Sequence, residues 1–250
     1  MHFLVFQHIA VEHPGILRDF MRADGVTWDA VELDEGEPIP SLEGYDGLIV
    51  MGGPMDVWQE DAHPWLLPEK AAIREAVRQR GLPCLGVCLG HQLLAEALGG
   101  KVGPMQTAEV GILDIELTQA GRADPLFAGV APVAPALQWH GAEVTAAPEG
   151  ATVLAQSPLC AIQAFRAAPL AYGIQYHVEL TATTVSDWGV IPEYAASLDR
   201  TLGEGGLQRM EADAAKHMAG FNANARKLYD NFMGLLRERQ GAPMQAAQGD

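Results

Sequence analysis

The stretch LPCLGVCLGHQLLAEAL, residues 82–98, sets the organisation of the chain. A short apolar run leads to Cys88, two glycines flank this cysteine, and a run of helical character follows. Gly86 and Gly90 allow a tight turn and a close approach of neighbouring backbone. The pattern predicts a strand that turns sharply into a helix at Cys88, as in the G-x-S-x-G elbow that presents a nucleophile. At a helix N-terminus, unpaired N–H groups and the helix dipole favour a thiolate.

Apolar runs and helical segments alternate along the chain before the elbow. The expected strands cover residues 2–7, 27–33, 46–51 and 83–87, and the expected helices cover residues 16–24 and 65–80. Unbroken apolar strands are typical of a parallel sheet that is buried on both faces. We therefore expect a three-layer α/β/α fold with a flavodoxin-like, mostly parallel sheet. Sites in such sheets lie at the carboxyl ends of the strands, where Gln7-His8, Gly52-Gly53-Pro54 and Cys88 would meet.

Beyond residue 100 the pattern changes to short alternating runs separated by proline and glycine. These runs, at residues 111–117, 133–139, 152–156 and 160–166, predict a small additional antiparallel sheet. A further buried strand is expected at residues 171–176. An apolar stripe from Leu207 to Leu235 predicts a C-terminal helix or helix pair, with Gly220 as a break. We expect the stripe to pack on its own domain; the alternative is a homodimer or partner-docking face.

Length and composition narrow the class of protein. We place an α/β domain at residues 1–203, a helical extension packed on it at 204–238, and a flexible tail at 239–250. The formal net charge of −16 argues against nucleic acid or an anionic membrane surface as a partner. The three cysteines lack framework spacing, and neither a signal peptide nor a run of transmembrane length is evident. These features indicate a cytoplasmic protein.

A nucleophilic cysteine needs a base that takes its proton and a third group that orients the base. His177 and Glu179 follow the last buried strand and lie two residues apart, so an extended chain would place both side chains on one face. A carboxylate beside the imidazole would fix its tautomer and favour its charged form. The sequence therefore predicts a triad of Cys88, His177 and Glu179.

Acyl transfer also needs hydrogen-bond donors for the oxyanion. The N–H group of Leu89, directly after the nucleophile, is one expected donor. Gly52-Gly53-Pro54 should supply the second donor from a neighbouring strand end. Gln92, four residues after Cys88, would lie on the same helix face and hydrogen-bond a polar substrate over the thiol.

Several polar residues allow two interpretations. His8, Glu12 and His13 follow the first strand, and they either line the leaving-group side of the site or are ordinary polar loop residues. Glu109 either contacts the site or is a solvated loop charge, and Trp139 is interpreted as a packing wall. The remaining candidates are interpreted as buried, inert thiols (Cys84 and Cys160) or as structural or surface histidines (His63, His91 and His217).

Three segments together resemble class-I, triad-type glutamine amidotransferases. They are Met51-Gly52-Gly53-Pro54, the elbow at residues 86–92, and Gln175-Tyr176-His177-Val178-Glu179, in the family's order of Cys before His-x-Glu. Within the family, the chain is most similar to stand-alone, GMP-synthase-like amidotransferase proteins, to which residues 109–111, 139–141 and 163–166 are also similar. The resemblance covers roughly residues 1–190, and the C-terminal helices resemble the extension of the stand-alone proteins.

The resemblance implies that the γ-amide of glutamine is hydrolysed. Cys88 would form a γ-glutamyl thioester, His177 would protonate the leaving ammonia and then activate water, and Glu179 would orient His177. The N–H groups of Gly53 and Leu89 would hold the oxyanion. Contacts to the small-molecule substrate would come from Gly52, Gln92, His140 and Gly141. No cofactor or metal is expected.

Two positions depart from the family pattern. Val178 stands where the family usually has proline, and Ala142 follows the His-Gly pair, where GMP-synthase-like members often have Asp. No ATP-pyrophosphatase or acceptor-binding domain is evident, so ammonia would pass to a separate synthase subunit or to solvent. Two alternatives stay open: a hydrolase of other γ-glutamyl amides or peptides, and a catalytically idle regulatory subunit.

Overall fold

The strands on both sides of the elbow join into one sheet. The computed structural model describes residues 1–241, and within them nine strands pair in the order β2-β1-β3-β4-β9-β8-β7-β5-β6. Strand β4, which leads to Cys88, lies between β3 and β9. The parallel strands are β2 (Thr27–Glu32), β1 (His2–Gln7), β3 (Gly47–Val50), β4 (Cys84–Val87) and β9 (Ala171–Ile174).

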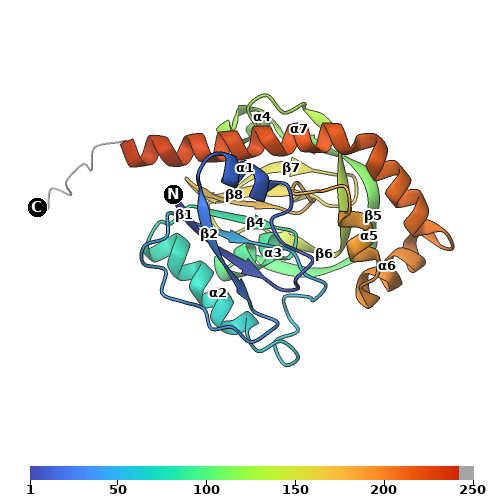
Figure 1. Cartoon of the computed structure of the whole chain (residues 1–250), viewed down its shortest axis with the longest axis horizontal. Helices are drawn as coiled ribbons and strands as arrows, with labels where there is room; N and C mark the ends of the chain where they lie inside the picture. The colour runs from blue at the N-terminus through green and yellow to red at the C-terminus, as the bar shows by residue number, and fades with distance from the viewer. Residues whose placement is uncertain (242–250) are drawn as a thin grey trace, which may run out of the picture.

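Side chains of the parallel strands alternate between two faces, and helices cover both. On β1, Phe3 and Val5 belong to one apolar cluster, whereas Leu4 and Phe6 belong to the other. Helices α1 (Leu17–Ala23) and α7 (Gly206–Gly241) cover the first face. The second face is covered by α2 (Leu66–Arg74), its π-helical extension η1 (Glu75–Gln79) and α3 (Leu89–Ala97) (Figure 1). The three-layer α/β/α class predicted from the sequence is confirmed.

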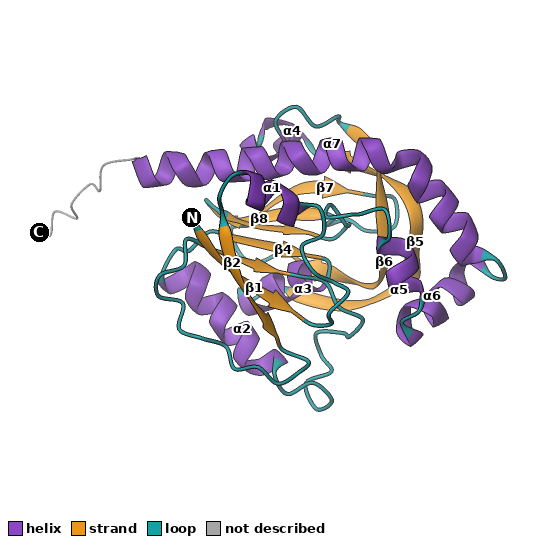
Figure 2. Cartoon of the chain, in the orientation of Figure 1, coloured by secondary structure: helices purple, strands orange, loops and turns teal. Residues whose placement is uncertain are grey.

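The antiparallel strands continue this same sheet and do not form a sheet of their own. Strand β8 (Ala164–Ala168) pairs with β9, β7 (Thr152–Gln156) with β8, β5 (Lys101–Leu117) with β7, and β6 (Val133–Ala146) with β5. Strands β5 and β6 are longer than expected, because a register shift between Pro104 and Glu109 carries the pairing past the proline. Helices α4 (Gln119–Ala123) and η2 (Pro125–Phe127) connect them (Figure 2).

The C-terminal part forms α5 (Thr184–Gly189), α6 (Pro192–Leu202) and α7. The predicted break at Gly220 is wrong, because α7 runs through it. A helical glycine costs about 1 kcal/mol relative to alanine, and the burial of Ala214 and Phe221 on either side of it offsets this cost. Residues 239–241 of the expected tail belong to α7, and residues 242–250 lie outside the described residues. Among the described helices, none combines the length and the apolar character that crossing a membrane requires.

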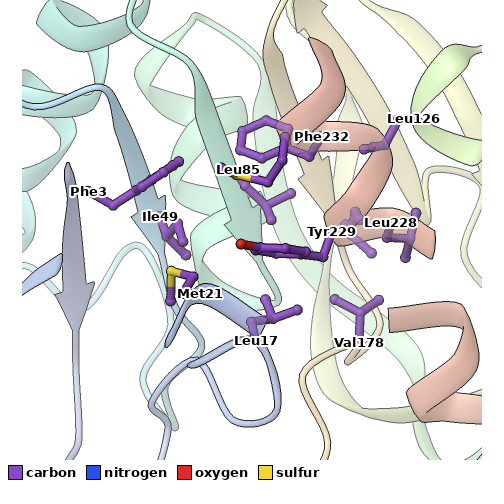
Figure 3. Close-up of a pocket in the computed structure, with 12 residues that line it drawn as sticks. Phe3, Leu17, Met21, Ile49, Leu85, Leu126, Val178, Leu228, Tyr229 and Phe232 are labelled. Carbon is purple, nitrogen blue, oxygen red and sulfur yellow. The ribbon is translucent and has the colours of Figure 1, made fainter. Parts of the chain in front are cut away.

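Helix α7 covers the apolar face of the parallel strands with its stripe. Leu228, Tyr229 and Phe232 project from α7 toward Ile49 and Leu85 of the sheet (Figure 3). The space left between them is a small apolar cavity of about 20 Å³. The stripe therefore packs on the α/β core of its own chain.

Leu228→Ala is expected to lower the free energy of unfolding by about 2–5 kcal/mol, because it removes buried methyl groups and enlarges an apolar cavity. Leu67→Ala is the matched control, because Leu67 is 55% exposed and Leu228 only 6%. Urea denaturation of both variants measures the difference. Equal losses for the two variants would show that α7 contributes little to the core.

Candidate active site

The turn between β4 and α3 holds Cys88 in a strained backbone conformation. Cys88 has φ 52° and ψ −106°, and it is the one non-glycine residue with positive φ in residues 1–241. A Cβ on Gly86 would lie 2.3 Å from the carbonyl oxygen of Gly90, and a Cβ on Gly90 would lie 2.0 Å from that of Val50. Both glycines are therefore required by the close approach of backbone at the elbow.

His177 and Glu179 are both buried and hydrogen-bonded to each other beyond the end of β9. His177 Nδ1 lies 2.9 Å from Glu179 Oε1, and the backbone N–H of His177 donates to the carbonyl of Leu137 on β6. Because the carboxylate accepts from Nδ1–H, the tautomer of the neutral ring leaves Nε2 as the acceptor. Nε2 makes no hydrogen bond of normal geometry to the described residues, although the Cys88 sulfur is close enough to raise the pKa of the ring. The dyad predicted from its spacing is thus assembled.

The charges around His177 favour its protonated form. Burial alone lowers the pKa of His177, but the Glu179 carboxylate and the Cys88 sulfur outweigh burial and hold this pKa well above its ordinary value. The ring also packs edge-on against Trp188, with centroids 4.4 Å apart. An imidazolium fixed in this way can stabilise a thiolate on Cys88.

An amide network that the sequence analysis missed lies beneath the thiol. Gln175 Nε2 is 3.7 Å from Cys88 Sγ, and Gln175 Oε1 accepts a hydrogen bond from Gln92 Nε2 at 3.1 Å. Gln92 Nε2 also donates to the carbonyl of Ala142 at 3.2 Å. The amide nitrogen of Gln92 is therefore occupied, which leaves its carbonyl oxygen for a substrate. Gln175 belonged to the quoted motif, but its contact with the thiol requires the end of β9 to lie beside the elbow.

A small cavity of about 60 Å³ lies over Cys88. The sequence-predicted residues that line it are Cys88, Gly53, Leu89, Gln92, His140 and Gly141. Gly52 does not line this cavity: it packs behind it, where an added Cβ would lie 1.9 Å from Glu12 Oε2. The N–H groups of Gly53 and Leu89 make no hydrogen bond to residues 1–241, which leaves both free to act as donors.

The side chain of His140 supports the wall of the cavity. Its Nδ1 lies 2.9 Å from the carbonyl of Ala142, and its Nε2 lies 3.1 Å from Glu109 Oε2. Glu109 also accepts hydrogen bonds from Ser157 and Gln163. Of the two interpretations of Glu109, the solvated loop charge is therefore wrong: Glu109 is buried and holds His140.

The polar residues after β1 lie behind the cavity. His8 and Glu12 are both fully buried, so they are not ordinary loop residues, whereas His13 contacts Arg18 and the N–H of Gly15. Burial raises the pKa of Glu12 to about 7, and its Oε1 accepts a hydrogen bond from the hydroxyl of Tyr194. Tyr194 comes from α6 and lines the cavity. No sequence signal identified Tyr194, because it lies in a helix outside every motif.

The remaining candidates are structural. His91 packs on Phe165, and burial lowers its pKa to about 3. Burial raises the pKa of the Cys84 and Cys160 thiols to about 12, which makes both unreactive. Trp139 packs against Trp188 and Tyr194 as a wall. In the part of the chain that the structure describes, no group of three or more His, Cys, Asp or Glu side chains is arranged to hold a metal ion.

Comparisons with known proteins agree with this geometry. The family model for glutamine amidotransferase class-I matches residues 16–187. The glutamine amidotransferase-like protein YfeJ of Salmonella typhimurium is 33% identical over 190 residues, which cover 74% of this chain and 77% of YfeJ. One subunit of the glutamine-hydrolyzing GMP synthase of Halobacterium salinarum is 34% identical over 179 residues, covering 71% of this chain and 85% of that subunit.

Solved structures give the same result. A glutamine amidotransferase of Thermotoga maritima superposes with a TM-score of 0.82 at 26% identity, covering 93% of this chain and 97% of that one. A glutamine amidotransferase of Methylobacillus flagellatus superposes with a TM-score of 0.80 at 28% identity, covering 93% and 94% of the two chains.

Glu179→Gln is expected to lower the pKa of His177, because it removes the carboxylate charge while burial of the ring remains. His177 should then lose its proton at a lower pH than in the wild-type protein. An NMR titration of the imidazole, assigned with a His177→Gln variant, measures the shift. Glu193→Gln, on the exposed face of α6, should leave the titration unchanged; an unchanged His177 midpoint in Glu179→Gln would contradict the role of the pair.

Proposed function

Since this chain belongs to the class-I glutamine amidotransferase family, we propose that it hydrolyses the γ-amide of glutamine through a thioester on Cys88. The observation that carries the proposal is the arrangement at the elbow. A strained turn presents Cys88 at the start of α3, and the buried His177–Glu179 pair lies beside it with Nε2 unpartnered. This arrangement is that of a nucleophile, a base and a group that orients the base.

In the first half of the reaction, Cys88 Sγ attacks the γ-carbonyl carbon of glutamine. The carbonyl oxygen becomes an oxyanion, which the unbonded N–H groups of Gly53 and Leu89 at the cavity wall would bind. The proton on His177 Nε2 passes to the amide nitrogen as the C–N bond breaks, and ammonia leaves. The raised pKa of His177 supports this step, because it favours the protonated ring that the step requires.

In the second half, His177 Nε2 takes a proton from water as the water oxygen attacks the thioester carbon. The C–S bond breaks, glutamate leaves, and the thiolate–imidazolium pair is restored. Loss of one oxyanion donor typically lowers kcat by about 10²–10³-fold in acyl-transfer enzymes. The two N–H groups are therefore expected to supply a large share of the rate enhancement.

The departure at Val178 is compatible with this chemistry. The N–H of Val178 donates to Glu179 Oε2 at 2.8 Å, and a proline at this position would have no N–H to donate. In this chain the backbone therefore holds the second carboxylate oxygen, while the first holds His177.

Glutamine is the proposed substrate in preference to larger γ-glutamyl amides, because the chain belongs to the class-I glutamine amidotransferases and a relative is named as glutamine-hydrolyzing. Polar groups of Gln92 and Asp56 line the cavity over Cys88, where they would contact the glutamyl part of the substrate. Burial raises the pKa of the Asp56 carboxyl group, and no hydrogen bond or ion pair from the described residues reaches that carboxylate. An α-ammonium group of the substrate would supply a counter-charge there. An idle regulatory subunit is not favoured, because Cys88, His177 and Glu179 are all present and buried, with His177 paired to Glu179.

The names of the relatives support a proposal for the fate of the ammonia. One of them is named as a subunit of a glutamine-hydrolyzing GMP synthase, and we propose that this chain likewise delivers ammonia to a separate synthase subunit or releases it to solvent. If a partner exists, the rate of glutamate release should rise when a candidate synthase subunit is added to this protein.

Cys88→Ala is expected to abolish glutamate release from glutamine and labelling by a glutamine-like diazoketone, because both require the thiolate. Cys84→Ala, four residues upstream on β4, should retain both, since its thiol is fully buried and unreactive. Coupled detection of glutamate and mass spectrometry of the labelled protein provide the two readouts. Glutamate release or labelling that persists in Cys88→Ala would refute the proposal.

Comparison of kcat/KM across a panel of γ-glutamyl amides tests whether glutamine is the preferred substrate. We expect kcat/KM for glutamine to exceed that for γ-glutamyl ethylamide and for γ-glutamyl peptides by at least tenfold, about 1.4 kcal/mol in transition-state binding, because a site matched to ammonia as the leaving group binds the transition state of a bulkier amide less well. A preference for any larger amide would instead support a γ-glutamyl hydrolase.

A further inference from the structure

A buried histidine–carboxylate pair that the proposed reaction does not use lies directly behind the Gly52-Gly53 segment. His8 follows β1 at the carboxyl edge of the sheet and is fully buried. Its Nδ1 lies 2.8 Å from the carbonyl oxygen of Gly52, and its Nε2 lies 2.8 Å from Glu69 Oε1 on α2. The ring stacks on Trp65 with centroids 5.3 Å apart. Both ring nitrogens and one ring face are therefore held in place.

The Gly52 carbonyl can only accept a hydrogen bond, so Nδ1 of His8 carries a proton and donates to it, while Nε2 and the Glu69 carboxyl share the second hydrogen bond. Burial alone lowers the pKa of His8, but Glu69, the Gly52 carbonyl and Glu12 outweigh it and raise this pKa above its ordinary value. The charged groups that face His8 are Glu69 from α2 and Glu12 from the loop after β1. Glu12 in turn faces His177 and Glu179 and accepts a hydrogen bond from Tyr194.

The contact between His8 and the Gly52 carbonyl also fixes the direction of the Gly53 N–H group, because both groups belong to the same planar peptide unit. No peptide bond in residues 1–241 is cis, and a trans peptide points its C=O and N–H in opposite directions. Because the Gly52 carbonyl points at His8, the N–H of Gly53 points away from His8. Gly53 packs against Leu89 and lines the cavity over Cys88. The N–H is therefore directed to the side where the oxyanion would form.

A peptide between two glycines rotates easily, because neither residue has a side chain to restrict it. We propose that His8, held by Glu69, is a positioning residue that fixes the Gly52–Gly53 peptide so that the Gly53 N–H faces the oxyanion. This inference rests on the proposed function, since an oxyanion forms only if Cys88 attacks a carbonyl group. It assigns the His8–Glu69 pair to transition-state stabilisation and leaves His177 and Glu179 as the proton-transfer pair.

Two substitutions by uncharged amide side chains test the proposal, because each one keeps a hydrogen-bond donor at the place of only one of the two ring nitrogens. In His8→Asn the amide nitrogen occupies the place of Nδ1 and can still donate to Gly52. In His8→Gln the amide reaches the place of Nε2, toward Glu69, and Gly52 loses its donor. We expect kcat for glutamine to stay within about tenfold of wild type in His8→Asn and to fall by about 10²-fold or more in His8→Gln, with KM little changed.

Alkylation of Cys88 by iodoacetamide is the internal control, because this displacement forms no oxyanion. Its rate should be the same in both variants and in the wild-type protein. Equal losses of kcat in the two variants, or no loss in His8→Gln, would overturn the proposal. Where His8→Gln does not fold, His8→Leu replaces it, since leucine fills the space without a donor.

Crystal structures of the two variants give a readout that does not depend on activity. The Gly52–Gly53 peptide should keep its orientation in His8→Asn and rotate in His8→Gln. An unrotated peptide in His8→Gln would overturn the proposal even if the enzyme is active. Absence of glutamate release from the wild-type protein, with a rotated peptide in the variant, would instead refute the proposed function and leave the role of His8 in peptide orientation intact.

Discussion

The close packing of backbone at the elbow is the constraint on which the site depends. The turn at Cys88 exists only because Gly86 and Gly90 carry no side chains where Gly90 and Val50 carbonyl oxygens approach. Strand β4 is buried between β3 and β9, so its end is held from both sides. The segment after β3 carries the glycines that offer N–H groups, and the segment after β9 carries His177. The parallel pairing of three strands thus brings Cys88, the Gly52-Gly53 segment and His177, which are the proposed nucleophile, oxyanion donors and base, to one place.

Three buried histidine–carboxylate pairs surround the cavity. His177 with Glu179, His8 with Glu69, and His140 with Glu109 lie within hydrogen-bond distance and are almost wholly excluded from solvent. Burying a charged pair costs solvation energy that the attraction of its members often only offsets. Their contribution is therefore better understood as positioning than as stability. Glu179 holds the His177 ring, His8 holds the Gly52 carbonyl, and Glu109 holds His140 at the wall formed by β6.

The C-terminal helices take part in the site as well as in the core. Helix α6 contributes Tyr194, which lines the cavity and donates a hydrogen bond to Glu12. Helix α5 contributes Trp188, which packs edge-on against His177. Helix α7 covers one apolar face of the parallel sheet. An α/β unit without these helices would leave His177 without its packing partner Trp188 and the cavity without the wall that Tyr194 provides.

The sequence by itself determined the features that depend on neighbours along the chain. The elbow at Cys88, the two-residue spacing of His177 and Glu179, and the alternation of strands and helices are all local patterns, and periodicity and glycine placement are enough to predict them. Only the tertiary structure decided the contacts between distant segments. The bond between Glu12 and Tyr194 spans 182 positions and that between His8 and Glu69 spans 61. Strand order and burial bring these side chains together, and neither leaves a signature in the local sequence.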